Sequence, residues 1–364
     1  MSFGTKKFLL LASALLFLSA CGLRRNPLDT PLITDSQQPD KELFDRATNF
    51  LEHSRFTEAR LLLQTLINTY PDSEYLAKSK LAIADSWYRQ GTSSDLLQAE
   101  SEYRDFITFF PLMPEAAEAQ MRVAMIHYRG MEKPDRDSTH ARRAEQEFQK
   151  VLLNYPNGPF APIAEQRLRE VQEVLADGQF DVSRFYFLQG ADRAAQPRLK
   201  ELVDRYPNYS QTPEALMLMG RSIERLKAAE GSAEAAGYYA RIVRDYPLSD
   251  QVDDAKEHLT ALGAPIPEAD PVAVARMTYE KTHAVSVGLW DTLMGGFHRR
   301  PSVAAAQGHN GPPTLTAQGA AQPGVISNLP QSVSPSSQGS SSPSGMTMET
   351  VPAPSSSGAP PGTR

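Results

Sequence analysis

The stretch FTEARLLLQTLINTYP, residues 56–71, decides the fold of this chain. Within it Ala59 is followed four residues later by Leu63, and the run ends in Tyr70-Pro71. Residues three and four apart share one face of an α-helix. Proline ends a helix because it lacks an N–H and disfavours helical geometry in the residue before it. The stretch therefore predicts an amphipathic helix that stops at the aromatic–proline pair.

The same pattern occurs five times along the chain. The aromatic–proline pairs are Tyr70-Pro71, Phe110-Pro111, Tyr155-Pro156, Tyr206-Pro207 and Tyr246-Pro247. Subtracting the proline numbers gives intervals of 40, 45, 51 and 40 residues. Twelve residues before each proline stands an alanine, and four residues after that alanine stands a large apolar residue. These couples are Ala59 with Leu63, Ala99 with Tyr103, Ala144 with Phe148, Ala195 with Leu199 and Ala235 with Tyr239.

This periodicity is typical of the tetratricopeptide repeat, a helix–turn–helix unit of about 34 residues. The alanine lets two helices approach closely, and the large residue fills the space beside it. We therefore predict an all-α solenoid of about five units over residues 40–263. A capping helix should close it at residues 250–261, because a solenoid end needs a polar face. Enlarged turns at 91–97 and 129–139, and an extended helix at 162–176, would account for intervals above 34.

Repeat arrays bind peptide segments on the face formed by the first helix of each unit. We expect contacts from side chains on or beside the first helices of the first three units that repeat packing leaves free. The candidates are Phe44, Thr48, Tyr75, Ala82, Ser86, Arg89, Arg122 and Arg129. The alternative for each of them is an ordinary solvated residue.

The first twenty residues are typical of an export signal. Lys6 and Lys7 precede an apolar run, residues 8–20, that is shorter than the roughly twenty residues a membrane span needs. The signal ends in Leu18-Ser19-Ala20-Cys21, which resembles the lipobox of bacterial lipoproteins. Cys21 is the single cysteine, so we predict that it carries the lipid, followed by a linker over residues 21–39. Gly22 after it is compatible with transfer to the outer membrane.

Residues 264–364 are rich in Pro, Ser and Gly, and such a segment lacks the apolar side chains that would offset the entropy of ordering. We predict a mostly disordered tail. Leu289, Leu293 and Phe297 recur at helical spacing, which indicates a short amphipathic helix near residues 286–298 that could touch a membrane or a partner. An incidental hydrophobic remnant is the alternative, because Gly295-Gly296 would weaken the helix.

The sequence contains none of the motifs that would indicate an enzyme. There is no glycine-rich phosphate loop, no His-Glu-x-x-His zinc motif and no Gly-x-Ser-x-Gly elbow. We therefore expect no catalytic activity, no metal and no cofactor. The net charge of −6 argues against a general nucleic-acid binder, which would show a basic face.

Over residues 40–262 the chain resembles the BamD family, the tetratricopeptide lipoproteins of the β-barrel assembly machinery. The family's link between the first two repeats resembles Tyr70-Pro71-Asp72-Ser73-Glu74-Tyr75, and its Asp-Arg-Phe-Ile stretch resembles Arg104-Asp105-Phe106-Ile107. Tyr128-Arg129-Gly130-Met131 and then Asp135-Arg136-Asp137 match its third-repeat insertion, and residues 180–190 resemble the segment before the second helix of its fourth repeat. Where the family has His-Pro, this chain has Met113-Pro114.

The resemblance implies a lipid-anchored scaffold on the periplasmic face of the outer membrane. Its amino-terminal repeats would bind unfolded outer-membrane protein segments, and its carboxy-terminal repeats would dock a BamA-like Omp85 insertase, with other assembly lipoproteins as further candidate partners. The alternative is a periplasmic repeat adaptor for envelope constriction or cell-wall synthesis, like CpoB. That family has an amino-terminal coiled coil and no lipobox, unlike this chain. A peptidoglycan-acting lipoprotein is the alternative of another class, and the sequence offers no residues for that chemistry.

Overall fold

The computed structural model describes residues 38–283, 301–309 and 311–315, and the secondary structure in these segments is helical. The predicted signal peptide, the lipidation site Cys21 and the amphipathic helix near 286–298 lie outside the described residues. None of the helices in the described part is long and apolar enough to cross a membrane.

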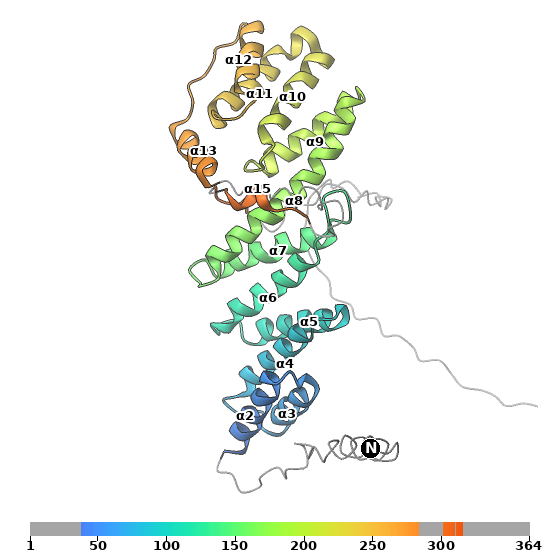
Figure 1. Cartoon of the computed structure of the whole chain (residues 1–364), viewed down its shortest axis with the longest axis vertical. Coiled ribbons are helices and arrows are strands. Elements are labelled where there is room, and N and C mark those ends of the chain that lie inside the picture. The colour runs from blue at the N-terminus through green and yellow to red at the C-terminus, as the bar shows by residue number, and fades with distance from the viewer. Residues whose placement is uncertain (1–37, 284–300, 310, 316–364) are drawn as a thin grey trace, which may run out of the picture. The chain divides into compact units, whose positions relative to one another are not determined.

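Between residues 39 and 245 the helices form five consecutive pairs, and each helix packs against the next one in the chain (Figure 1). The pairs are α2 (Pro39–Glu52) with α3 (Phe56–Thr69), α4 (Leu76–Gln90) with α5 (Ser93–Phe109), α6 (Glu115–Arg129) with α7 (Thr139–Asn154), α8 (Ala161–Leu188) with α9 (Asp192–Arg205), and α10 (Thr212–Lys227) with α11 (Ser232–Asp245). A short 3-10 helix, η2 (Ala228–Gly231), joins the last pair. The predicted all-α tetratricopeptide fold is confirmed.

The aromatic–proline pairs end the second helix of every unit, as predicted. In each case the aromatic residue is the C-cap, and its N–H still donates to the carbonyl four residues back, as Tyr70 N–H does to Leu66 O at 2.8 Å. The following proline cannot continue the helix. The five alanines that precede these pairs are fully buried, and so are the five large residues one turn later. The residues that make up the repeat pattern in the sequence are therefore the ones buried where the helices pack.

Three apolar clusters hold the described helices together. The first joins α2, α3 and α4, and the second joins α4, α5 and α6. The third is larger and runs from α6 to α12, including Phe148, Leu199 and Tyr239. The amino-terminal units thus have small separate cores, whereas the carboxy-terminal units share a continuous one.

The turns differ in part from the prediction. The turn after α4 is not enlarged, because Thr92 and Asp95 form a capping box that starts α5 at Ser93. The long third-repeat loop, residues 130–138, is confirmed between α6 and α7. It packs against α8 at Gly178, where a Cβ atom would lie 2.7 Å from the carbonyl oxygen of Pro134.

The predicted extended helix is longer than expected, since α8 has 28 residues, and the predicted capping helix is α12 (Val252–Ala261). Two parts of the predicted tail are ordered. Helix α13 (Pro271–His283) follows α12, and a segment containing the short helix α15 (Ala304–Gln307) contacts α8. The apolar residues of 271–283 are enough for a helix, so the predicted disordered tail does not begin directly at residue 264.

Candidate partner-binding face

An aromatic pair lies where the first two units meet. The Phe44 ring on α2 lies 5.2 Å from the Tyr75 ring, centroid to centroid, and Tyr75 is the N-cap of α4. Both side chains are half-buried, and the Lys78 ammonium lies 5.7 Å from the Tyr75 ring. Thr48 donates its hydroxyl to the carbonyl of Phe44, one turn back on the same helix. The structure therefore joins Phe44, Thr48 and Tyr75 into one partly accessible apolar surface.

A second group gathers around Tyr88 at the end of α4. The guanidinium carbons of Arg122 and Arg129 lie 5.2 and 4.7 Å from the Tyr88 ring centroid. These two arginines are seven residues apart, two turns of α6, and so share a face. Arg89, next to Tyr88, is exposed, as is Arg129. The result is a cationic surface supported by an aromatic ring, which suits an acidic or aromatic partner.

Ser86 does not belong to this accessible surface. It is fully buried, donates to the carbonyl of Ile83 and accepts a hydrogen bond from Arg60 at 3.1 Å. The expectation that repeat packing leaves Ser86 free is therefore wrong. The guanidinium carbon of Arg60 also lies 3.6 Å from the ring centroid of the neighbouring Trp87, so α3 and α4 are in contact at this point.

Next to the Tyr88 group lies a half-buried acid, Asp85. The Tyr103 hydroxyl donates to the Asp85 carboxylate, and burial raises the pKa of Asp85, although that hydrogen bond and Arg122 oppose the shift. Burial raises the pKa of Tyr103, and the neighbouring Asp85 carboxylate raises it further, because both disfavour the ionised phenol. Asp85 and Tyr88 were not among the predicted site residues. The sequence signal that could have found them is their spacing, because residues three apart on α4 lie on the same helix face.

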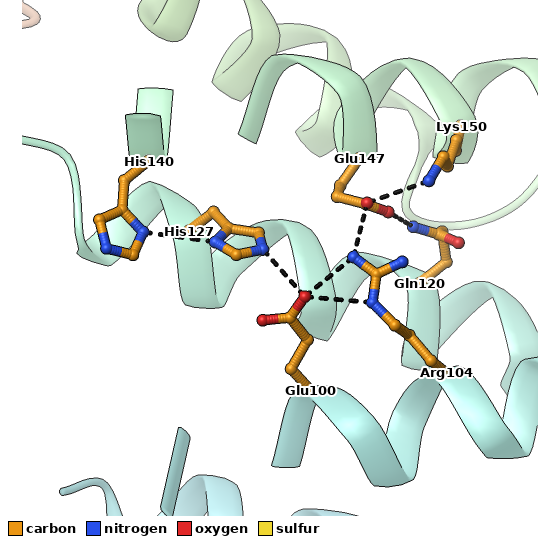
Figure 2. Close-up of polar contacts among 7 residues, drawn as sticks. All are labelled: Glu100, Arg104, Gln120, His127, His140, Glu147 and Lys150. Atoms are coloured by element: carbon orange, nitrogen blue, oxygen red, sulfur yellow. Dashed lines mark hydrogen bonds and ion pairs between the residues drawn. The ribbon is translucent and has the colours of Figure 1, made fainter. Parts of the chain in front are cut away.

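Figure 2 shows a second polar group, which joins α5 to α6 and α7. Arg104 on α5 bridges two carboxylates, lying 2.9 Å from Glu100 and 2.8 Å from Glu147. Glu147 also accepts from Gln120 at 2.6 Å and from Lys150 at 3.0 Å. Burial raises the pKa of Glu147, but the hydrogen bonds from Arg104 and Lys150 outweigh it and hold that pKa below its ordinary value.

The same group continues into two histidines. His127 is buried and lies 3.2 Å from Glu100 and 3.3 Å from His140. Burial lowers the pKa of His127 although Glu100 opposes the shift, so the ring is held neutral. Gly130 makes room for this contact, because a Cβ there would lie 2.9 Å from His140 Nδ1. We call these seven side chains in Figure 2 the polar joint.

The polar joint fixes α6 relative to α5, and α6 carries Arg122 and Arg129. Its chemistry is structural, because every carboxylate in it has a cationic, amide or imidazole partner. Across the described segments no group of His, Cys, Asp or Glu is arranged to hold a metal ion. What this region can do is present a fixed surface to another polypeptide.

The aromatic and cationic residues on α2, α4 and α6 and the polar joint all lie within a stretch that matches a known family. A family of outer membrane lipoproteins, YfiO, matches residues 36–238, which is more than half of the chain. The chain belongs to this family. The YfiO match covers all of α2 to α10.

Individual relatives are named BamD, which confirms the resemblance to the BamD family. "Outer membrane protein assembly factor BamD" of Neisseria gonorrhoeae is 26% identical over 236 residues, covering 63% of this chain and 88% of the relative. The factor of the same name from Pasteurella multocida is 23% identical over 209 residues, covering 55% and 80%. Among solved structures, a thermophilic tetratricopeptide protein from Thermus thermophilus shares 14% identity at a TM-score of 0.28, covering 61% of this chain and 98% of that one.

Proposed function

We propose that this BamD-family chain is a non-catalytic scaffold for outer-membrane β-barrel assembly. It is anchored through lipidated Cys21 to the periplasmic face of the outer membrane. Membership of the family supports the role in outer-membrane protein assembly. The observation that carries the finer proposal is the accessible aromatic and cationic surface of α2, α4 and α6, which we call the amino-terminal face. It comprises Phe44, Thr48, Tyr75, Arg89, Arg122 and Arg129, and the ring of Tyr88 that the last two arginines contact is itself buried.

The amino-terminal face suits an unfolded outer-membrane protein segment. The terminal strand of an unassembled barrel has an unpaired edge of N–H and C=O groups and alternates apolar with polar side chains. Half-buried Phe44 and Tyr75 offer an apolar contact, while exposed Arg89 and Arg129 offer hydrogen-bond donors to carbonyl or carboxylate oxygens. In this proposal the carboxy-terminal units dock the BamA-like Omp85 insertase. The lipid anchor keeps substrate binding and insertase binding together beside the membrane.

A peptide-binding experiment tests the proposal for the amino-terminal face. The full lipidated chain in detergent is titrated with a fluorescent peptide that copies the terminal strand of a barrel. The double variant Arg89→Glu with Arg129→Glu should bind about tenfold more weakly, because two favourable charges become repulsive. Phe44→Ala should weaken binding by a smaller factor. Arg198→Glu is the matched control, since Arg198 is also exposed and lies 4.7 Å from a tyrosine ring, but on α9.

Equal binding by the double variant and the control would contradict the amino-terminal site. Copurification from outer membranes tests the other half of the proposal. An Omp85-type barrel should be recovered with the wild-type chain and with the Arg89→Glu, Arg129→Glu double variant. Recovery of Tol–Pal or cell-wall synthesis proteins without that barrel would instead support the CpoB-like adaptor.

A further inference from the structure

Residues 301–309 and 311–315 lie across the carboxy-terminal units, far along the chain from the helices they touch. We call them the strap. Figure 1 shows α15 of the strap beside α8. The strap is bonded to α7, α8 and the turn after α9, whereas the amino-terminal face lies on α2, α4 and α6, so the two sites use different helices and neither depends on the other.

The repeats hold the strap mainly by its backbone. Gln172 on α8 makes two bonds to Thr314, donating to its carbonyl at 2.7 Å and accepting from its N–H at 3.0 Å. Other side chains of α7, α8 and the turn after α9 also donate to backbone carbonyls of the strap. These bonds are Gln149 to Thr314 O, Gln166 to Ala306 O, Arg169 to Gly311 O and Asn208 to Pro312 O.

Amide and guanidinium groups that bond to peptide carbonyls recognise an extended chain whatever its side chains are. A pair of bonds from one amide to the N–H and C=O of one residue, as at Gln172, also fixes the direction of that chain. With the strap in place Gln149 and Gln172 are buried, and the backbone of the strap supplies the partners that their buried amide groups need. The groove is therefore built to be filled by a polypeptide.

The strap contributes little apolar burial of its own. Its buried residues are Ala306, Gly308 and Gly311, and Leu315 is about half exposed. At Gly311 a Cβ would lie 2.9 Å from the side-chain atoms of Asn208, so the groove admits only a small residue at this position. Beside the strap, a cleft of about 460 Å³ opens toward Tyr246 and Arg276. A segment without a large buried side chain makes few apolar contacts and would bind weakly as a separate peptide. Its attachment to the same chain favours binding, because no translational freedom is lost.

From these contacts we propose that the groove formed by α7, α8 and the α9–α10 turn is a second peptide-binding site, and that the strap is its built-in competitor. The ligand is an extended segment of a partner protein with Ala or Gly at the positions of Ala306, Gly308 and Gly311. When the partner segment binds, it takes over the bonds from Gln166, Arg169, Gln172 and Asn208, and the strap leaves.

The test uses the full chain and a fluorescent synthetic peptide with the sequence of residues 301–315. The release variant, Ala306→Arg with Gly311→Val, changes only the strap, so the repeats are untouched. Its apparent Kd for the added peptide should be at least tenfold tighter than that of the wild-type chain, whose groove is filled. Adding Gln172→Ala or Gln166→Ala to the release variant should remove this gain. Gln64→Ala, an exposed glutamine on α3, is the control and should leave it intact.

Two further peptides separate a binding site from a fixed part of the fold. One has an unrelated sequence with Ala, Gly and Gly at the three buried positions, and the other has Leu at all three. The first should bind the release variant and the second should not. The proposal is overturned if the release variant binds no peptide better than the wild-type chain does. It is also overturned if both glutamine variants, folded as judged by circular dichroism, retain binding. Binding of the native strap sequence alone would equally exclude a partner segment.

Discussion

The amino-terminal and carboxy-terminal repeats of this chain are built from the same unit but present different surfaces. On the amino-terminal units, Phe44 and Tyr75 stay partly accessible and Arg89 is exposed. On the carboxy-terminal units, part of the surface over α7 and α8 is covered by the chain's own strap. The repeat pattern is the same in both regions, so it fixes the packing between paired helices and leaves the outer surface free to diverge.

The two regions also differ in how their cores are connected. The clusters around Leu63 and Tyr103 each span three helices, whereas the cluster around Phe148 continues from α6 to α12. In a repeat protein, stability is a sum of unit and interface terms. A perturbation in the continuous cluster should therefore spread further along the chain than one in a small cluster.

Substitution of Phe148 should give the largest effect and tests this difference directly. Phe148→Ala removes a fully buried ring and should cost about 3–5 kcal/mol of unfolding free energy. In hydrogen exchange it should reduce protection from α6 through α11. Leu63→Ala, at the equivalent position of the first unit, should cost about 2–5 kcal/mol and affect mainly α2 to α4. If both variants loosen the same set of helices, the two regions do not differ in the way the clusters indicate.

A pair of glycines sharpens the comparison within the continuous core. At Gly220 on α10 a Cβ would lie 2.5 Å from the Tyr239 ring, so Gly220→Ala should destabilise by about 1–3 kcal/mol through overpacking. Gly237 on α11 has nothing within 4 Å of its Cβ position, and Gly237→Ala should stabilise by about 0.5–1 kcal/mol. Thermal unfolding of both variants measures the opposite signs. An unchanged free energy of unfolding in Gly220→Ala would mean that α10 and α11 can move apart at little energetic cost.

The sequence predicted the repeat because its physical causes are local. Ala59, Leu63 and Pro71 act within two turns of one helix, so their spacing is visible along the chain, and the structure confirms it at all five sites. Arg122 and Arg129 could also be placed on one face, since they are two helical turns apart. The structure adds that they share the ring of Tyr88.

The missed features depend on contacts between residues far apart in sequence. Ser86 seemed free because its burial by Arg60 comes from the neighbouring helix. The strap escaped prediction because Gly, Ala and Pro carry no apolar signal, and its docking depends on side chains such as Gln172 that lie 142 positions away. The polar joint was hidden for a similar reason, since Arg104 and Glu147 each resemble solvated helix residues until their helices pack.

The smallest predicted effect is a pH dependence confined to the polar joint. Burial lowers the pKa of His127 in the folded chain, whereas an unfolded histidine titrates near a pKa of about 6.5. As the pH falls below about 6.5, the unfolded chain gains a proton that the folded chain does not, so the free energy of unfolding decreases until the folded pKa is passed. Hydrogen exchange at pH 7.5 and 5.5 should show the loss in α5 to α7, which contain Glu100, His140 and the other groups facing His127, and little change in α10 and α11. His127→Gln should reduce this pH dependence, while His53→Gln, at an exposed position beside α2, should not. An unchanged pH dependence in His127→Gln would show that another group causes it and would contradict the assignment to His127.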